Sequence, residues 1–328
     1  MHTIYFDAGT TNTRVYLLEN YKLLCTKSEL VGARNTAIDN SKARLKQTVR
    51  ALYQDILVEN GLKPADIEHV YISGMASSPD GLHEVDHLQT PVPLQKLRSS
   101  LVRYRDDSVI PQDIWLIPGI RTDSSIDLPT SPQNAVHMHM IRGEETEVFG
   151  LINKLDPHIS YMVALPGSHT QIISIQNNCI ADFFSGITGE IRDAVINHTI
   201  LKSALSQKGP ETLNPEFVLL GYRTLHECGF NHALYGVRTM DLFSKSTDAQ
   251  RHSYFQGVLT GGMIDGVLQR ANRNHWGAKR LIVVGRTIEY DAYHTIMPIA
   301  APDIQVNHYD TGSIPLSVKG YIAIARGN

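Results

Sequence analysis

One pattern of short strands and small-residue turns occurs twice in this sequence, and it limits the fold more than any other feature. The first copy, over 3–26, has three apolar, β-forming runs separated by a small polar turn at 8–13 and by a turn at Glu19-Asn20. Apolar runs of this length bounded by turn residues predict strands that pair as an antiparallel meander.

The second copy lies in the middle of the chain. An ungapped alignment of residues 6–13 with 164–171 places Gly9 on Gly167, with a hydroxyl residue after each glycine, and the next polar turn of each copy also coincides. A helix-rich stretch follows both copies, so we expect two pseudo-equivalent domains. Two unrelated hairpins with glycine corners would give part of the same match.

Composition excludes several classes of protein. The 328-residue length fits about two domains, and 42% hydrophobic with 19% charged residues is typical of a folded chain rather than a disordered one. A net charge of -3 provides no strong basic field, so we expect neither nucleic acid nor a membrane as partner. The three cysteines are far apart, no apolar run could cross a bilayer, and the N-terminus lacks a basic leader region. We therefore expect a reduced, cytoplasmic protein.

Beyond the meanders, helical periodicity and short apolar runs predict the remaining elements. The expected helices are 41–60, 144–155, 190–205, 215–228 and 248–273, and the expected buried strands include 70–73, 114–117, 161–165 and 281–284. Residues 77–93 and 121–134 have no clear period and read as long loops. Within the last helix, Gly261-Gly262 either breaks the helix or lets another group pack close.

The first turn has the composition of a phosphate-binding loop. The first strand ends in Asp7, and Gly9-Thr10-Thr11-Asn12 follows. Small residues let the backbone approach a polyphosphate, whose oxygens accept hydrogen bonds from N–H groups and hydroxyls. A carboxylate at the strand end can hold Mg²⁺ through its waters. A plain hairpin with Asp7 as turn former is the alternative, and neither a Walker A nor a GxGxxG motif is present.

A second turn of this kind, Gly167-Ser168-His169-Thr170, strengthens the phosphate interpretation. Two such turns on related domains could hold a phosphate chain from both sides. We expect His169 to be a turn residue rather than a catalytic one. The buried strand that ends at Gly285 could pass beneath a nucleotide base, although plain packing explains it as well.

Two adjacent carboxylates, Glu144 and Glu145, precede the second turn and open a helix. Acidic residues in a first turn favour the helix dipole, which is one explanation for them. The other is that one carboxylate accepts the proton of an attacking hydroxyl, as phosphoryl transfer requires. Asp182 and Glu190 flank a further small-residue turn, and structural roles explain them as well as a role in a site does.

Several segments, taken together and in order, resemble the 2-dehydro-3-deoxygalactonokinases. They are FDAGTTNTRVYLL, IWLIPG, IRGEET, LPGSH, DFFSGITGEI and YGVRTM. The resemblance runs through most of the chain, and IRGEET followed by LPGSH and TGE is its specific part, since many sugar kinases share the first glycine loop. It implies an α/β fold of the actin-like ATPase superfamily, with two ribonuclease-H-like domains and ATP·Mg²⁺ in an interdomain cleft. The implied reaction transfers the γ-phosphoryl group to the terminal hydroxyl of 2-dehydro-3-deoxy-D-galactonate, giving the 6-phosphate, in galactonate catabolism.

The resemblance also implies roles for individual residues. The expected phosphate-binding residues are Asp7, Gly9, Thr10, Thr11 and Asn12 in the first turn, and Gly167, Ser168 and His169 in the second. Asp7 is expected near Mg²⁺, and Gly285 falls in the adenosine motif, where Arg286 replaces a more usual small residue. Glu144 takes the place of the sugar-kinase general base at a helix start, and Glu145 is the second candidate.

The substrate region is less defined. Arg14, Arg121 and Arg142 are candidates to hold a substrate carboxylate, because a guanidinium fork pairs well with it, and Ser77 is a further substrate candidate. The sequence departs from the family's usual aromatic residue and proline in the loop after Gly74-Met75, which leaves the identity of the acid open.

We expect an N-terminal domain over 1–130, with the first phosphate loop and part of the sugar site. A C-terminal domain over 131–328 would carry the catalytic glutamate, the second phosphate loop and the adenosine region. Two rival functions remain: an exopolyphosphatase-like phosphohydrolase, in which water is the nucleophile, and a nucleotide-gated binding protein of the same fold. A homodimer is compatible with the sequence.

Overall fold

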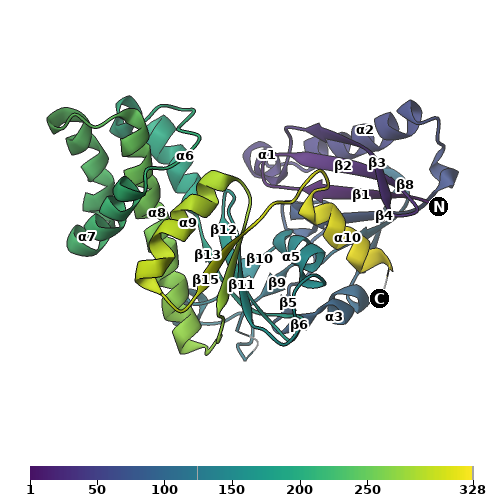
Figure 1. Cartoon of the computed structure of the whole chain (residues 1–328). Coiled ribbons are helices and arrows are strands. Elements are labelled where there is room, and N and C mark those ends of the chain that lie inside the picture. The colour runs from purple at the N-terminus through teal and green to yellow at the C-terminus, as the bar shows by residue number, and fades with distance from the viewer. Residues whose placement is uncertain (124, 327–328) are drawn as a thin grey trace. The chain divides into compact units, whose positions relative to one another are not determined.

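The computed structural model describes residues 1–123 and 125–326, which form two compact units (Figure 1). Unit 1 comprises Met1–Asp156, Asn178–Ala181 and the chain from Gly312 onward, and unit 2 comprises Pro157–Asn177 and Asp182–Thr311. The domain boundary after residue 130 stays a prediction. In the compact units, residues 131–156 group with unit 1.

The sheet of unit 1 has the strand order β3-β2-β1-β4-β8-β7. Its strands are β1 (His2–Ala8), β2 (Thr13–Glu19), β3 (Lys22–Glu29), β4 (Ile67–Gly74), β7 (Val102–Asp106) and β8 (Ile110–Leu116). β2 is antiparallel to β1 and to β3, whereas β4 is parallel to β1 and β8 is parallel to β4. The meander predicted over 3–26 is therefore confirmed.

Short strands complete unit 1. β5 (Leu88–Gln89), β9 (Ile120–Arg121) and β10 (Met140–Ile141) form a small separate sheet, of which β5 lies within the first predicted loop, 77–93. β6 (Val92–Pro93) pairs with Cys179 and Ile180, which group with this unit.

The sheet of unit 2 repeats the arrangement of the first, with the order β15-β14-β11-β12-β13. Its strands are β11 (Tyr161–Leu165), β12 (Thr170–Gln176), β13 (Cys179–Gly186), β14 (Arg280–Val284) and β15 (Gln305–Tyr309). β12 is antiparallel to β11, and β14 is parallel to β11, as β2 and β4 are to β1. The repeated topology confirms the duplication, because each glycine turn joins the first two strands of its sheet.

Helices cover the sheets because their apolar residues recur on one face. Unit 1 contains α1 (Ala33–Asp39), α2 (Ala43–Glu59), α3 (Leu94–Ser99), α4 (Pro132–Ala135), α5 (Glu144–Ile152) and α10 (Leu316–Arg326). Unit 2 contains α6 (Thr188–His198), α7 (Pro215–Phe243), α8 (Asp248–Arg273) and α9 (Thr287–Ala300). Short 3₁₀ helices occur at Pro64–Asp66, Met75–Ser77 and Ile200–Ser203. In α2, for example, Leu45, Val49 and Ile56 are buried in the core beneath the first sheet.

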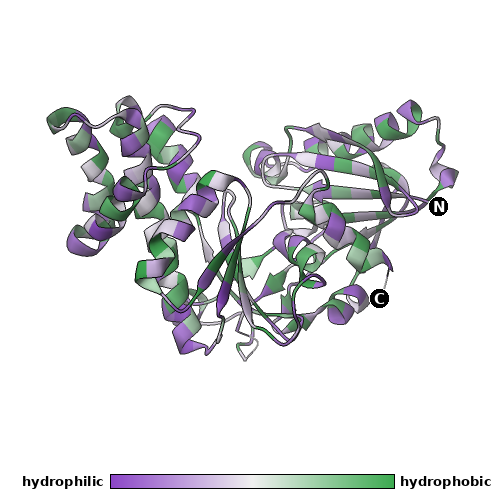
Figure 2. Cartoon of the chain, in the orientation of Figure 1, coloured by the Kyte–Doolittle hydropathy of each residue, from purple (hydrophilic) through white to green (hydrophobic). Residues whose placement is uncertain are grey.

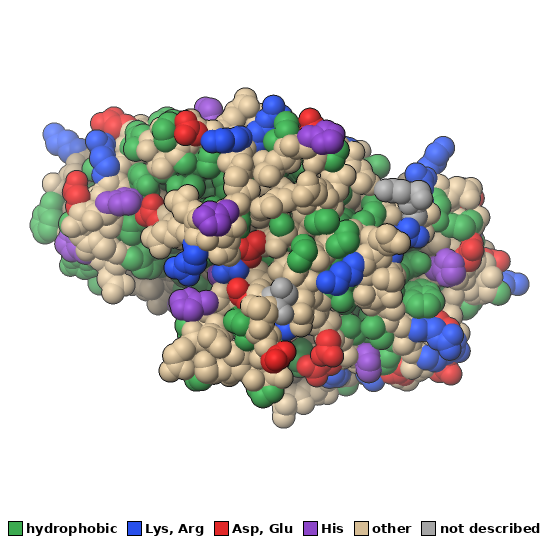
Figure 3. All heavy atoms as spheres, turned by 90° about the horizontal axis from the view of Figure 1, so that it is seen from below, with side chains coloured by type: hydrophobic (Ala, Val, Ile, Leu, Met, Phe, Trp, Pro, Cys, Tyr) green, Lys and Arg blue, Asp and Glu red, His purple; other side chains and the backbone are tan. Residues whose placement is uncertain are grey.

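Figure 2 shows hydrophobic residues along the strands of both sheets, where the cores lie. On the face in Figure 3, acidic and basic side chains are interspersed rather than gathered into one field. Within the described part of the chain, no helix has both the length and the apolar composition needed to cross a membrane.

Close packing explains the glycines in the helices of unit 2. A Cβ on Gly257 would lie 2.1 Å from the carbonyl oxygen of Val218, and one on Gly261 would lie 2.5 Å from the ring of Tyr222. The second alternative is thus correct for Gly261, because α8 is continuous and packs tightly on α7, whereas a Cβ on Gly262 would meet no atom within 4 Å. The predicted helix end at 228 is confirmed, because Gly229 has a non-helical backbone with φ +75° and forms a kink between two helical segments of α7.

Candidate functional site

The glycine turn of unit 1 is fixed by backbone contacts. Gly9 donates its N–H to the carbonyl oxygen of Asn12 at 2.8 Å, and Arg34 donates its N–H to the carbonyl oxygen of Thr10 at 2.9 Å. A Cβ on Gly32 would lie 2.4 Å from the carbonyl oxygen of Gly9, so only glycine allows this approach. The turn is consequently a rigid loop of small residues, with the side chain of Thr11 exposed.

A stack of small residues brings the acidic helix α5 to the end of β1. Gly74 has φ +77°, and a Cβ there would lie 2.4 Å from the carbonyl oxygen of Ala8. Gly143 has φ +116°, and its Cβ would lie 3.3 Å from the Cα of Gly74. Glu144, the first residue of α5, therefore lies near the carboxyl end of the strand that carries Asp7.

The two predicted catalytic glutamates have different surroundings. Glu144 is partly exposed, and its Oε2 accepts a hydrogen bond from the backbone N–H of Arg142 at 3.0 Å. Glu145 is fully buried, and its Oε2 accepts a hydrogen bond from the N–H of Gly143 at 2.6 Å. Burial, and then the neighbouring Glu144, raise the pKa of Glu145 to about 8. Glu144 is accordingly the more accessible of the two.

Asp7 lies at the end of β1, with Arg14 beside it on β2. The Arg14 Nη1 and the Asp7 Oδ2 are 3.6 Å apart. Burial raises the pKa of Asp7 despite this cation, and burial together with Asp7 raises the pKa of Glu147 to about 8. Mg²⁺ usually takes one or two carboxylates together with phosphate and water oxygens. These hard oxygen donors fit that role, although no group of three His, Cys, Asp or Glu side chains is arranged to hold a metal among the described residues.

Arg142, a predicted substrate residue, is engaged inside unit 1. Its Nη1 donates to the carbonyl oxygen of Ser77 at 2.5 Å and to the Ser77 Oγ at 2.7 Å, and its Nη2 donates to the carbonyl oxygen of Val85 at 3.0 Å. Ser77 is fully buried. Burial and the Arg142 charge lower the pKa of His87 to about 4. Arg142 and Ser77 thus fix the loop that follows β4, and their substrate roles stay predictions.

Arg121 is similarly occupied, whereas Arg14 is not. Arg121 is 7% exposed, and its Nη2 donates to the carbonyl oxygen of Ile126 at 3.2 Å. The side chain of Arg14 is 45% exposed, and Asp7 is its ion-pair partner. Of the three candidate arginines, Arg14 presents the most accessible guanidinium.

The glycine turn of unit 2 packs against the start of α6. A Cβ on Gly189 would lie 2.1 Å from the carbonyl oxygen of Gly167, and Glu190 donates its N–H to the carbonyl oxygen of Ser168 at 3.1 Å. The exposed side chains of His169 and Glu190 form an ion pair of 3.3 Å when the histidine is protonated. This turn is therefore held by backbone contacts, as the first one is.

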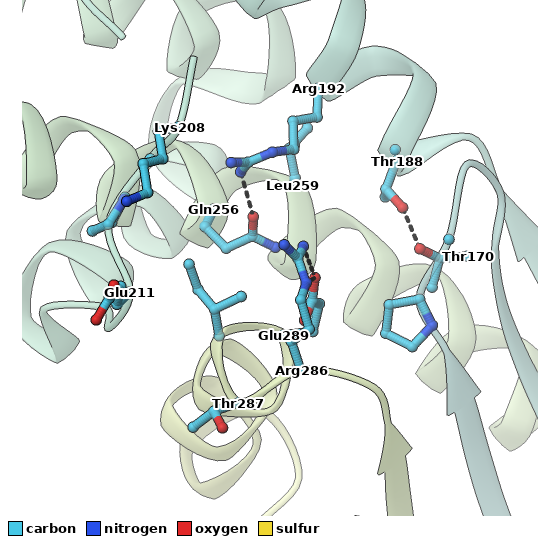
Figure 4. A pocket seen from close by; sticks show the side chains of 16 residues that line it. Thr170, Thr188, Arg192, Lys208, Glu211, Gln256, Leu259, Arg286, Thr287 and Glu289 are labelled. Carbon is cyan, nitrogen blue, oxygen red and sulfur yellow. Dashed lines mark hydrogen bonds and ion pairs between the residues drawn. The ribbon is translucent and has the colours of Figure 1, made fainter. Parts of the chain in front are cut away.

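A cavity of about 670 Å³ begins at this turn (Figure 4). Its lining comes from the turn, from α6, α8 and α9, and from a loop before α7: Pro166, Gly167, Thr170, Thr188, Gly189, Arg192, Lys208, Gly209, Pro210, Glu211, Gln256, Leu259, Arg286, Thr287, Ile288 and Glu289. This volume lies within the range of small-ligand and cofactor sites. Of the predicted cofactor residues, Gly167 lines the cavity, while Ser168, His169 and Gly285 adjoin lining residues.

Sequence reasoning missed most of the cavity wall. Gly285 has φ +128° and leads into Arg286, the N-cap residue of α9, which forms an ion pair with Glu289. The Lys208-Gly209-Pro210 turn was a signal that could have been noticed, but nothing in the sequence places it beside α8. Asp182 lies elsewhere: it accepts hydrogen bonds from Arg270 and from the Trp276 Nε1, at 2.7 and 2.8 Å, and is structural.

Comparison with known proteins agrees with this geometry. A crystal structure of a protein assigned as a 2-dehydro-3-deoxygalactonokinase from Sinorhizobium meliloti is similar, with a TM-score of 0.76 and 21% identity, covering 99% of this chain and 96% of that one. An acetate kinase from Entamoeba histolytica shares the fold, with a TM-score of 0.51, 8% identity and full coverage of both chains. These likenesses establish that the chain has the two-domain α/β fold of these proteins, in agreement with the fold that the resemblance implies.

Sequence relatives carry the same name. The chain is 25% identical over 201 residues to the probable 2-dehydro-3-deoxygalactonokinase DgoK1 of Rhizobium meliloti (strain 1021). The aligned region spans 61% of each chain. It is 23% identical over 262 residues to the 2-dehydro-3-deoxygalactonokinase of Escherichia coli (strain K12), which spans 80% of this chain and 78% of that one. The model of the 2-keto-3-deoxy-galactonokinase family matches residues 7–314. Because this match covers nearly the whole sequence, the chain belongs to the 2-keto-3-deoxy-galactonokinase family.

Proposed function

We propose that this protein is an ATP-dependent kinase that phosphorylates the terminal hydroxyl of a 2-keto-3-deoxy sugar acid. The leading substrate is 2-dehydro-3-deoxy-D-galactonate, and the product is its 6-phosphate. The observation that carries the proposal is the family match over residues 7–314, which includes both glycine turns and the acidic start of α5. Membership of a kinase family implies that the chain uses a nucleotide.

The cavity in unit 2 supports this nucleotide role. A volume of about 670 Å³ is ample for a nucleoside, and the glycine turn at its edge offers backbone N–H groups to a phosphate chain. Leu259 and Ile288 supply apolar surface that suits a base, while Gln256 and Thr287 supply polar groups. We assign the adenosine of ATP to this cavity and its phosphates to the end beside Gly167.

The acids of unit 1 support the chemical step. Glu144 is partly exposed and can accept the proton of the attacking hydroxyl, and its position is fixed by the glycine stack behind α5. Asp7, whose charge raises the pKa of the nearby Glu147, would hold Mg²⁺, which when bound neutralises developing phosphate charge. Glu145 would position α5 through its bond to the Gly143 N–H.

Arg14 is the residue we propose for the substrate carboxylate, because its guanidinium is the most accessible of the three candidates. An Arg14→Gln variant should raise the KM for the sugar acid by about 10–100-fold, which corresponds to a lost charged hydrogen bond. The KM for ATP should change far less. An equal rise in both would show that Arg14 acts on the nucleotide or on Asp7 instead.

The decisive experiment is a screen of sugar acids with ATP, in which ADP formation and sugar phosphorylation are both measured. We expect phosphorylation of 2-keto-3-deoxy sugar acids, with 2-dehydro-3-deoxy-D-galactonate preferred. Phosphate release from ATP without any acceptor would identify a phosphohydrolase instead. ATP binding without turnover on any acid would support a nucleotide-gated binding protein.

A further inference from the structure

Arg192 is a cation in the wall of the unit 2 cavity, and no carboxylate among the described residues forms an ion pair with it. Arg192 lies on α6, close in sequence to Gly189, and its guanidinium points into the cavity toward Gln256 (Figure 4). Its Nη1 donates to the Gln256 Oε1 at 3.2 Å, and the Gln256 Nε2 donates to the Thr260 Oγ1 at 2.9 Å. The neighbouring helix α8 therefore fixes the direction of this guanidinium.

Gly209, in the loop before α7, leaves space for the guanidinium of Arg192. A Cβ on Gly209 would lie 3.2 Å from the Nη2 of Arg192, so a larger residue would crowd the guanidinium. Gly209 has φ +64°, a conformation that also favours glycine. The loop before α7 is thus shaped around Arg192.

The charges around Arg192 are unbalanced. Within residues 1–123 and 125–326, no carboxylate forms an ion pair with Arg192, although its side chain is only partly exposed. Arg286 is largely exposed and has Glu289 as its partner. Burial, and then the nearby Arg286, lower the pKa of Arg192, and the charge of Glu289 opposes them only in part. A partly buried guanidinium without a counter-ion is costly, so this position favours an anionic ligand.

The proposed function brings one suitable anion to this cavity. The nucleoside of ATP is neutral, and its γ-phosphoryl group must stay accessible to the sugar acid. The phosphate that the cavity can enclose is the one joined to the ribose. We propose that Arg192 binds the α-phosphate of the nucleotide and makes the cavity select nucleotides over nucleosides, an inference that rests on the proposed nucleotide site.

The test is a competition assay without sugar acid, in which AMP and adenosine displace a fluorescent ADP analogue. Wild type should bind AMP more tightly than adenosine. Arg192→Gln should weaken AMP binding by about 10–100-fold, as loss of a charged hydrogen bond does, and change adenosine binding by less than about 3-fold. Arg192→Lys retains the charge but loses the planar guanidinium fork. Its affinity for AMP should lie between those of the wild type and Arg192→Gln. In turnover, the KM for ATP should rise while kcat changes little.

The control is Arg223→Gln, which removes a cation from the exposed face of α7, outside the cavity lining. It should leave the ratio of AMP to adenosine affinity unchanged, and thermal unfolding should confirm that all variants are folded. Equal losses of AMP and adenosine in Arg192→Gln would show that Arg192 only shapes the cavity, and would overturn the inference. A loss seen with ADP but not with AMP would overturn the α-phosphate assignment.

The outcomes also separate this inference from the proposed function. If Arg192→Gln selectively loses AMP binding but the wild-type protein phosphorylates no sugar acid, the role of Arg192 in binding the α-phosphate would be supported and the kinase activity rejected. A wild-type protein that binds no adenine nucleotide would overturn both. Kinase activity with an unchanged AMP preference in Arg192→Gln would reject the inference alone.

Discussion

The two glycine turns share a topology but serve different surroundings. Gly9 and Gly167 both follow the first strand of their sheet, and each turn is contacted by the backbone of a second glycine, Gly32 or Gly189. In unit 1 the strand before the turn carries Asp7, and the acidic start of α5 lies beside it. In unit 2 the equivalent position is the apolar Leu165, and the adjoining cavity contains three cations.

The difference indicates how two units of the same topology can contribute different chemical groups. The repeated feature is the rigid turn, which offers backbone donors in both units. The features that differ are side chains from helices outside the repeat: α5 supplies carboxylates in unit 1, and α6 supplies Arg192 in unit 2. We infer that the acidic unit handles the metal and the acceptor, and that the basic cavity handles the nucleotide.

The largest expected effect comes from Glu144→Gln. Loss of a general base typically costs about 10²–10⁴-fold in rate, so kcat should fall by that factor. ATP affinity should stay near its wild-type value, because the proposed nucleotide cavity is lined by residues of unit 2. Steady-state kinetics with a sugar acid, combined with nucleotide binding, measures both. Full turnover in this variant would show that Glu144 is not the general base.

The close contact between Gly189 and Gly167 allows the role of the second turn to be tested. In Gly189→Ala, the new Cβ would lie 2.1 Å from the carbonyl oxygen of Gly167, so the second turn must move. We expect the KM for ATP to rise by about 10-fold or more, since each factor of ten requires only about 1.4 kcal/mol.

Gly262→Ala is the matched control, because a Cβ there meets no atom within 4 Å. It should be neutral or slightly stabilising in α8. Unchanged ATP kinetics in Gly189→Ala would indicate that the second turn does not touch the nucleotide.

The stability of unit 1 should depend on pH through the buried carboxyl group of Glu145. The pKa of Glu145 is raised from 4.5 to about 8, so the folded protein binds more protons than the unfolded chain between these values. The free energy of unfolding contributed by this group therefore falls as the pH rises through that window. Each pKa unit corresponds to about 1.4 kcal/mol, so Glu145→Gln should be more stable relative to wild type at pH 8 than at pH 5.

Urea denaturation at the two pH values measures this difference. Arg238→Gln in unit 2 serves as the control, because its partner Asp241 is partly exposed, unlike Glu145. An identical pH dependence in Glu145→Gln and wild type would contradict the assignment of a neutral, buried Glu145.

The smallest effect is expected for His169→Ala. Its ion pair with Glu190 is exposed, and such pairs contribute about 0–1 kcal/mol. Because the second turn is held by backbone contacts, we expect stability and kcat to change little. A large fall in kcat would instead give His169 a catalytic role that the turn geometry does not require.

Much of the fold could be predicted because its signals are local. The strand at Tyr161–Leu165 and the helix at Asp248–Arg273 occur at the predicted bounds, since apolar period and capping residues mark them in the sequence. The helix after residue 215 is interrupted at Gly229, as the sequence predicts, because this glycine has a non-helical backbone. The sequence analysis did not predict the second helical segment, which follows the kink and ends at Phe243.

The candidate site was predictable in part. The glycine turns and Glu144 were found because small residues and a helix start are visible in sequence. Arg121 and Arg142 looked equal to Arg14 as substrate ligands, yet their guanidinium groups are bonded to carbonyl oxygens of their own unit. Which arginine remains accessible depends on distant backbone positions, and no spacing in the sequence encodes that.

The sequence by itself determined the duplicated strand pattern, both glycine turns and the family, because these depend on residue type and order. The tertiary structure alone decided that Arg192, Gln256 and Glu289 line one cavity, and that no carboxylate among the described residues forms an ion pair with Arg192. The reason is physical: a charge acquires its role from the groups within a few ångströms of it. Those groups come from helices that are adjacent only after folding.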